Sequence, residues 1–133
     1  GDNMRKTEIA TENAPQAIGP YSQAIAVGKT LYCSGQIPIN PATGNIESTD
    51  ITEQTHRALN NVHAVLAAAG ADMNDVVKTT VYLTDLNDFA TVNAIYGEYF
   101  EKPYPARSCV QVAALPKNAK IEIEVTARLR DKL

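Results

Sequence analysis

Residues 105–129 read P-A-R-S-C-V-Q-V-A-A-L-P-K-N-A-K-I-E-I-E-V-T-A-R-L, a pattern that predicts two β-strands separated by a turn. In the second strand, residues 120–129, apolar and polar side chains alternate, which places them on opposite faces of a sheet. The polar set includes Glu122, and the first strand, residues 107–113, begins with Arg107. If these strands pair as neighbours, a permanent cation and a carboxylate face each other across a small pocket. Such a pocket suits a small anionic substrate and an activated water.

Upstream of this stretch the sequence predicts two helices. Over residues 50–69 apolar side chains recur at three- and four-residue spacing, the pattern of a helix with one buried face. Asp50 and Glu53 have the spacing of a capping box, and Gly70 suits the position just past the helix end. A second helix is expected over residues 88–100, followed by two prolines that stop it.

Three further strands are expected. Residues 23–27 and 30–34 are short β-like runs joined by Gly28 and Lys29, a two-residue hairpin signal. Residues 76–84 are rich in β-branched side chains and form the third. Alternate residues of this strand, Val77, Thr79, Val81 and Leu83, are expected to share one face.

These elements predict one α+β domain over residues 1–133. The order β-β-α-β-α-β-β implies a mixed sheet with both helices on one face. Residues 1–16 are polar and expected to be extended or loosely held, and the turn-rich residues 38–50 form a long loop. Met4 resembles a native start, so residues 1–3 are expected to be left over from cloning.

The second face of the predicted sheet is partly apolar and partly charged. Its expected side chains are Thr80, Tyr82, Glu122 and Thr126. Such a face is often covered by another subunit, so we expect a homo-oligomer.

Composition restricts the classes of partner. The net charge is −3, and the 12 Lys and Arg residues are scattered, which disfavours nucleic acid as the main partner. We find no apolar run near the ~20 residues of a membrane span, and no secretory signal. Two cysteines indicate reduced thiols rather than a disulfide framework. We therefore expect a cytoplasmic protein, with a mitochondrial location left open.

Arg107 and Glu122 are the leading candidates for chemistry. A guanidinium can bind a carboxylate through two parallel hydrogen bonds; the alternative is a surface arginine paired with a nearby acid. If a partner closes its face, Glu122 becomes partly buried and its pKa rises, which suits proton exchange with water. The alternative for Glu122 is a solvated charge.

Other candidates are weaker. Cys109 lies on the same side of its strand as Arg107 and is expected to be a core cysteine. His56 and His63 are two helical turns apart, too far to share a metal ion, and no metal site is predicted. Gly35 would let a ligand approach the backbone, and Tyr21 could contact a small substrate; a turn and a packed tyrosine are the alternatives. No cofactor-binding motif is present, so cofactor chemistry has no support.

Taken together, four motifs carry a resemblance. They are I-G-P-Y at residues 18–21, S-G-Q-I-P at 34–38, D-L-N-D-F-A-T-V-N at 85–93, and P-A-R-S at 105–108 followed by I-E-I at 121–123. In this order they resemble the RidA/YjgF family of enamine/imine deaminases, over residues 9–128. The sequence departs from the family pattern at two places: the segment 100–105 is shorter than in other members, and Gln111 stands where an acidic residue is common.

The resemblance implies a chorismate-mutase-like α+β fold, assembled as a homotrimer around a barrel-like core with clefts between subunits. It implies hydrolysis of reactive 2-imino and enamine acids, such as 2-aminoacrylate, to 2-keto acids and ammonia. This reaction protects pyridoxal-phosphate enzymes and uses no cofactor or metal.

The resemblance also implies roles for individual residues. Arg107 would hold the substrate carboxylate, and Glu122 would position and activate water. The pocket would be lined by Tyr21, Ser34 and Asn93, with backbone contacts from Gly35 and Cys109.

Two other classes of function remain open at this point. A non-catalytic regulatory protein that binds 2-keto acids would have the same pocket. Translation inhibition, ribonuclease activity or chaperone-like behaviour would use other surfaces, and the acidic charge weighs against RNA.

Overall fold

The computed structural model describes residues 5–131, so the expectation for residues 1–3 lies outside it. The elements follow the order β1 (Thr7–Ile9), β2 (Ala24–Val27), β3 (Thr30–Gln36), α1 (Ile51–Ala68), β4 (Val76–Leu83), α2 (Phe89–Tyr99), β5 (Ala106–Gln111) and β6 (Ile121–Arg128). Short 3₁₀ turns, η2 (Met73–Asp75), η3 (Leu86–Asp88) and η4 (Pro116–Asn118), precede β4, α2 and β6.

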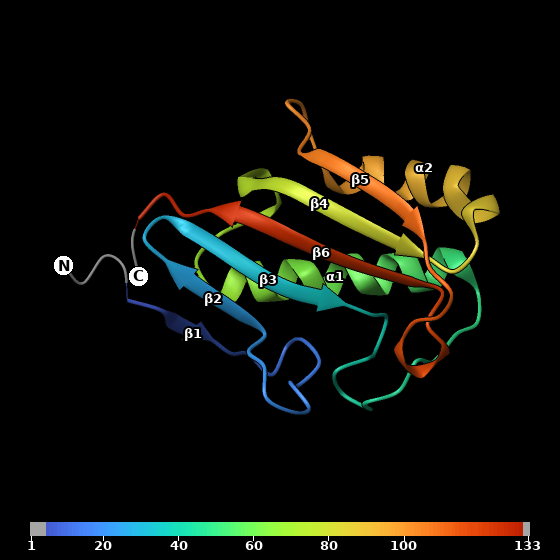
Figure 1. The fold of residues 1–133 in the computed structure, drawn as a ribbon, viewed down its shortest axis with the longest axis horizontal. Coiled ribbons are helices and arrows are strands. Elements are labelled where there is room, and N and C mark those ends of the chain that lie inside the picture. Colours follow the sequence, from blue (N-terminus) through green and yellow to red (C-terminus); the bar gives the residue numbers. More distant parts are fainter. Residues whose placement is uncertain (1–4, 132–133) are drawn as a thin grey trace.

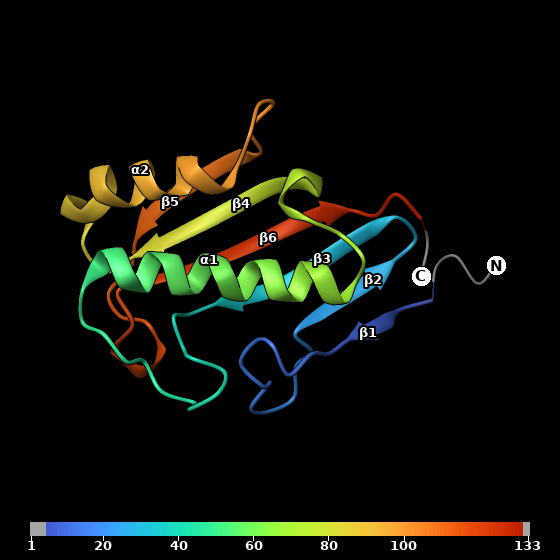
Figure 2. The same cartoon turned by 180° about the vertical axis from the view of Figure 1, so that it is seen from behind.

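The strands form one mixed sheet in the order β1-β2-β3-β6-β4-β5. Only β4 and β5 run parallel, and the other neighbours are antiparallel. Both helices cover the same face, which lies behind the sheet in Figure 1 and in front of it in Figure 2. This confirms the predicted α+β class, and it adds β1, an edge strand inside the segment expected to be extended or loosely held.

The strands of Arg107 and Glu122 are not neighbours, because β4 lies between β5 and β6. The condition under which the two side chains would face each other within one chain is therefore not met. Arg107 pairs with Thr79 on one side of β4, and Glu122 pairs with Tyr82 on the other. A strand that follows its predecessor through a helix can run parallel to it. Through α2, β5 therefore takes the outer edge beside β4, and β6 enters the sheet between β3 and β4.

The helix α1 begins and ends as its sequence predicts, with one change. Asp50 accepts a hydrogen bond from the backbone N–H of Glu53, but the Glu53 carboxylate accepts from Ser48 instead of closing the capping box. At the other end Gly70 has φ +75°, and hydrogen bonds from Gly70 and Ala71 to the carbonyls of Ala67 and Leu66 form a Schellman motif.

The core lies between the helices and one face of the sheet. The alternation in β6 puts Ile121, Ile123, Val125 and Ala127 into this core, each at most 2% exposed. They pack with buried apolar side chains of α1 that include Leu59, Val62, Val65 and Leu66. Glu122, Glu124 and Thr126 consequently point to the uncovered face of the sheet.

One of the four side chains expected to share a face of β4 does not join the other three. Val77 is 50% exposed, whereas Val76, Thr79, Val81 and Leu83 are buried. The pairing of β4 with β6 shifts register between Val76 and Lys78. Such a bulge resets the alternation at the start of the strand, an event that the local pattern does not reveal.

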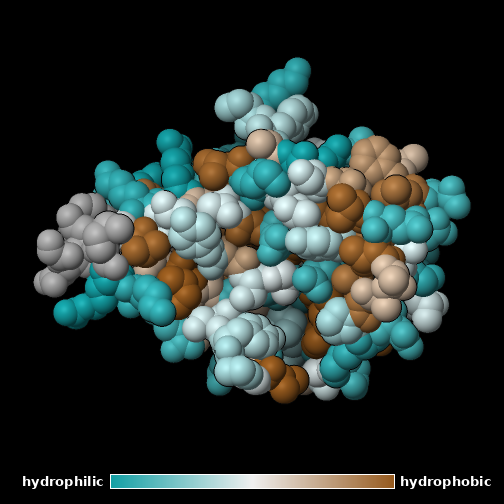
Figure 3. Space-filling model, viewed as in Figure 1, coloured by the Kyte–Doolittle hydropathy of each residue, from teal (hydrophilic) through white to brown (hydrophobic). Residues whose placement is uncertain are grey.

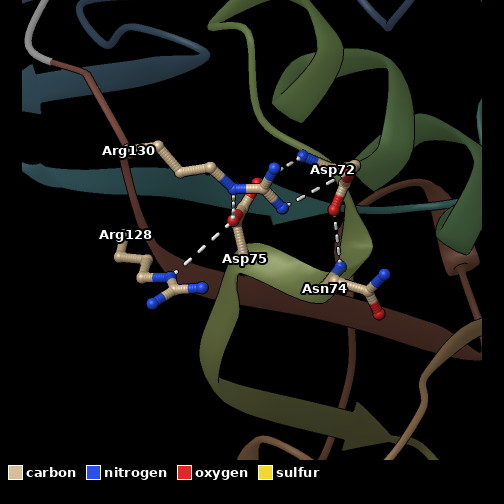
Figure 4. A network of polar contacts seen from close by, with 5 residues as sticks. All are labelled: Asp72, Asn74, Asp75, Arg128 and Arg130. Carbon is tan, nitrogen blue, oxygen red and sulfur yellow. Dashed lines mark hydrogen bonds and ion pairs between the residues drawn. The ribbon is translucent and has the colours of Figure 1, made fainter.

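A buried carboxylate ties the end of β6 to the turn before β4 (Figure 4). Asp75 is 2% exposed, accepts from the backbone N–H of Asp72 at 3.0 Å, and accepts from Nε of Arg130 at 3.1 Å. Arg128 lies 3.8 Å from the same carboxylate oxygen. Both arginine side chains are largely exposed, so the stabilisation comes mainly from the buried backbone contact.

Asp75→Ala is expected to lower the free energy of unfolding by about 1–3 kcal/mol, because it leaves the Asp72 N–H without its acceptor. Urea denaturation measures this change. The matched control is Asp131→Ala, an exposed carboxylate next to Arg130 in the chain, with an expected change below about 0.5 kcal/mol. Equal destabilisation by the two substitutions would contradict the anchoring role of Asp75.

Candidate active site

Glu122 lies at a cavity of about 480 Å³ where β6 meets β3. The pairing of these strands shifts register between Cys33 and Gln36, so Ser34 and Gly35 form an irregularity beside Glu122. Bulges of this kind often redirect side chains next to functional sites. The cavity is also lined by Tyr21, Gln23, Ile37, Pro116 and Lys117, among others.

Gly35 is required by the approach of the Glu122 side chain. A Cβ atom added at Gly35 would clash with Oε2 of Glu122 and lie 3.0 Å from its Cγ. The backbone of Gly35 has no positive φ, so close approach rather than conformational freedom explains the glycine. Ser34 is fixed as well, since its hydroxyl donates to the carbonyl of Ser22 at 2.7 Å.

The environment of Glu122 favours its protonated form. Burial raises the pKa of the Glu122 carboxyl, and the nearby negative charge of Glu124 raises it further. Glu124 accepts a hydrogen bond of 2.7 Å from the hydroxyl of Tyr82, the cross-strand neighbour of Glu122. The raised pKa of Glu122 agrees with the sequence-based expectation, and it arises within a single chain, without a covering partner. Such a carboxyl is suited to taking a proton from water and returning it.

Arg107 lies at a second cavity, of about 420 Å³, on the helix-covered side of β5. Its Nη1 donates to Oδ1 of Asn93 on α2 at 2.7 Å. Its guanidinium carbon lies 4.8 Å from the ring centroid of Tyr96 and 5.4 Å from that of Phe89. The guanidinium is thus held in place and still has N–H donors for an anion.

The structure separates the predicted site residues into two groups. Tyr21, Ser34 and Gly35 lie with Glu122, whereas Asn93 lies with Arg107. Arg107 lies on the same face of the sheet as its register partner Thr79, a fully buried residue that is hydrogen-bonded to Tyr96 of α2. Glu122 lies on the opposite face with its register partner Tyr82. Within one chain the cation and the carboxylate therefore lie on opposite faces of the sheet.

Cys109 behaves as the sequence predicts. It is partly buried against the core, on the same side of β5 as Arg107. Burial raises the pKa of its thiol, and the charge of Arg107 acts weakly in the opposite direction. The side chain is a poor nucleophile in this environment.

In the second predicted helix, residues 88–100, the sequence places Phe89 and Tyr96 on one side, but it does not predict their contact with Arg107. The helical spacing of three residues between Asn93 and Tyr96 was the available signal, because it puts both on one face. His56 is not among the residues that line the Arg107 cavity, and its Nδ1 lies 2.7 Å from the hydroxyl of Tyr99. Among residues 5–131, no group of three or more His, Cys, Asp or Glu side chains is arranged to hold a metal ion.

The uncovered face of the sheet has a mixed surface (Figure 3). Hydrophobic and hydrophilic side chains are interspersed across it, and Tyr32 is 54% exposed. A shallow cavity on this face is lined by Tyr32, Lys78, Thr80, Glu124 and Thr126, among others.

Comparison with known proteins assigns the family. Residues 11–129 match the Ribonuc_L-PSP family, described as Endoribonuclease L-PSP. The chain belongs to this family. Its Ribonuc_L-PSP relatives include a RutC family protein of Pyrococcus abyssi, 56% identical over 93% of this chain and 98% of the relative. A 2-iminobutanoate/2-iminopropanoate deaminase of Escherichia coli strain K12 is 55% identical, again over 93% and 98%.

Solved structures agree with this assignment. A Rid-family protein from Yersinia pestis, YyfA, superposes with a TM-score of 0.92 at 52% identity, covering 94% of this chain and all of that one. The resemblance noted from four sequence motifs is therefore confirmed at the level of family and fold. Within the described residues of this Ribonuc_L-PSP chain, none of the helices has the length and apolar character to cross a membrane.

Glu124→Gln is expected to lower the pKa of Glu122, because it removes the negative charge that adds to the effect of burial. The pKa should stay above the usual glutamate range, since burial is the larger cause. A ¹³C NMR titration of the side-chain carboxyls measures both effects. Tyr82→Phe is the control: it removes the hydrogen bond to Glu124 but keeps the charge, so the pKa of Glu122 should remain above that in Glu124→Gln. An unchanged pKa in Glu124→Gln would rule out the proposed coupling.

Proposed function

We propose that this chain is a 2-iminobutanoate/2-iminopropanoate deaminase, which hydrolyses reactive 2-imino and enamine acids to 2-keto acids and ammonia. The observation that carries the proposal is the half-buried carboxyl of Glu122 with its raised pKa, at a cavity in a chain of this family. The Escherichia coli relative at 55% identity bears the name of this activity.

The chemistry requires little beyond positioning and proton transfer. Water adds its oxygen to C2 of the imine, the C=N electron pair moves to nitrogen, and Glu122 takes the proton from water. Glu122 returns this proton to nitrogen, which gives a carbinolamine. The proton of the C2 hydroxyl then passes to nitrogen by way of Glu122, the C–N bond breaks, ammonia departs, and C2 becomes a keto carbon. Proton transfer of this kind contributes typically about 10² to 10⁴ in rate.

Arg107 supplies orientation in this proposal. Its guanidinium forms charge-assisted hydrogen bonds with the substrate carboxylate and holds C2 in place for attack. Asn93 and Tyr21 line the pocket with Ser34, and the backbones of Gly35 and Cys109 contact the substrate.

The placement of Arg107 and Glu122 on opposite faces of one sheet requires two copies of the chain for one site. We therefore propose a homotrimer in which Arg107 of one subunit and Glu122 of the next line the same cleft. The mixed surface of the uncovered face supports this assembly, because a partly apolar face is suited to burial against another subunit. The trimer is also what the family resemblance implies.

The proposed setting is the cytoplasm, with the mitochondrion as the alternative. Enamine and imine acids leak from pyridoxal-phosphate enzymes, and their rapid hydrolysis protects those enzymes. Cys33 and Cys109 are both free thiols in the structure, as a reducing compartment allows.

A second candidate is suggested by the family description, which names an endoribonuclease. The net charge of −3 weighs against a surface that neutralises phosphates. A non-catalytic protein that binds 2-keto acids is the other alternative. It needs Arg107 but not Glu122, because a bound keto acid exchanges no proton with water.

A coupled assay tests the proposal. A pyridoxal-phosphate dehydratase generates 2-aminoacrylate from serine, and release of pyruvate is followed with and without this protein. Wild type should accelerate release; Glu122→Ala should lower kcat by about 10² to 10⁴, and Arg107→Ala should chiefly raise KM. Arg57→Ala, an arginine of α1 at a different cavity, should match wild type.

Two results separate the alternatives. Binding of 2-oxobutanoate without any acceleration would replace the enzyme with a keto-acid-binding protein. If both Arg107→Ala and Glu122→Ala still cleave RNA, and wild type does not hydrolyse imines, the protein is a ribonuclease that acts through another surface.

A further inference from the structure

The guanidinium of Arg107 lies against aromatic rings of α2. Its central carbon is 4.8 Å from the ring centroid of Tyr96 and 5.4 Å from that of Phe89, both within the range of cation–π attraction. Only one hydrogen bond of this guanidinium to another side chain is found among residues 5–131, the one to Asn93. Contact with the ring faces leaves the other N–H donors free for an anion.

Tyr96 is itself held rigidly. The side chain is 6% exposed, and its hydroxyl lies 2.8 Å from Oγ1 of Thr79, a residue with no exposed surface. Its ring centroid is 4.5 Å from that of Phe100. Burial raises the pKa of the Tyr96 hydroxyl, so the ring remains a neutral phenol beside Arg107.

The strand pairing completes this arrangement. Thr79 on β4 is the register partner of Arg107 on β5. The same strand pair therefore carries Arg107 and the residue that fixes Tyr96, so the position of the ring depends on the backbone that carries the guanidinium. A link from Thr79 through Tyr96 to Arg107 connects the buried core to a cation at a cavity.

We propose that Tyr96, fixed by Thr79, is a positioning residue that pre-orients Arg107 to bind the substrate carboxylate. The inference deepens the proposed function and rests on the carboxylate-binding role of Arg107. An unrestrained arginine side chain populates many rotamers. It loses this conformational freedom when it binds a planar carboxylate through two hydrogen bonds. Because Tyr96 holds the guanidinium before the ligand arrives, binding requires less ordering. Truncation of the ring should thus weaken ligand binding and raise KM, with a smaller effect on kcat.

Binding of 2-oxobutanoate, measured by isothermal titration calorimetry, tests the inference. Tyr96→Leu should weaken binding about 2- to 30-fold, the range that corresponds to loss of a cation–π contact. Tyr96→Phe keeps the ring face and should stay nearer to wild type than Tyr96→Leu. The matched control is Tyr99→Leu, which removes a tyrosine of the same helix that contacts His56 instead of Arg107. It should bind as wild type does.

A second measurement applies if Tyr96→Leu folds poorly. The Nε–Hε NMR signal of Arg107, assigned by its absence in Arg107→Lys, should show a ring-current shift in wild type. Thr79→Val keeps every ring but releases the Tyr96 hydroxyl, so the shift should decrease and KM should rise without an equal fall in kcat. Loss of thermal stability with unchanged KM, binding and shift would mean that Tyr96 and Thr79 only pack the core, which overturns the inference.

The outcomes also distinguish this inference from the proposed function. If Arg107→Ala abolishes 2-oxobutanoate binding while Tyr96→Leu binds like wild type, the positioning role is wrong and the carboxylate-binding role stands. If Arg107→Ala leaves binding unchanged, the proposed role of Arg107 is wrong, and the inference fails with it.

Discussion

The alternation of side chains along β6 is the constraint on which the rest of the structure depends. Ile121, Ile123 and Val125 enter the core under α1, and this burial stabilises the domain at roughly 25 cal/mol for each Å² of apolar surface removed from water. A shift of one residue would turn these side chains out and bury Glu122 and Glu124 without partners. The position of the carboxyl on the uncovered face is therefore a consequence of core packing.

The same constraint on β4 decides where the cation lies. Thr79 faces the helices, and its register partner Arg107 follows it to that side, beside Asn93 and Tyr96. Each half of the proposed site is prepared separately: the carboxyl by burial and by the charge of Glu124, the guanidinium by an amide and two rings. A site made of two such halves couples catalysis to assembly, because an isolated chain presents each group to a different side.

Much of this could be predicted from the sequence, because the signals are local. The caps of α1, the hairpin at Gly28 and the alternation of β6 each involve residues within a few positions of one another. The positions of β5 and β6 in the sheet could not be predicted in this way, because strand order depends on which strands a later strand pairs with in the folded protein. The bulge beside Val77 and the contact of Tyr96 with Arg107 are likewise set by tertiary pairing. The motifs around Arg107 and Glu122 nevertheless identified the family without the correct geometry.

The most direct measurement of the central claim is a subunit-mixing experiment. Arg107→Ala and Glu122→Ala are co-expressed with different tags, and mixed oligomers are purified through both tags and verified by native mass spectrometry. If Arg107 of one subunit completes the site of the next, each mixed trimer carries one intact site out of three, and imine hydrolysis returns to about a third of wild type. Arg107→Ala mixed with the Arg107→Ala/Glu122→Ala double variant should stay inactive. Verified mixed oligomers as inactive as their parents would contradict a site shared between two chains.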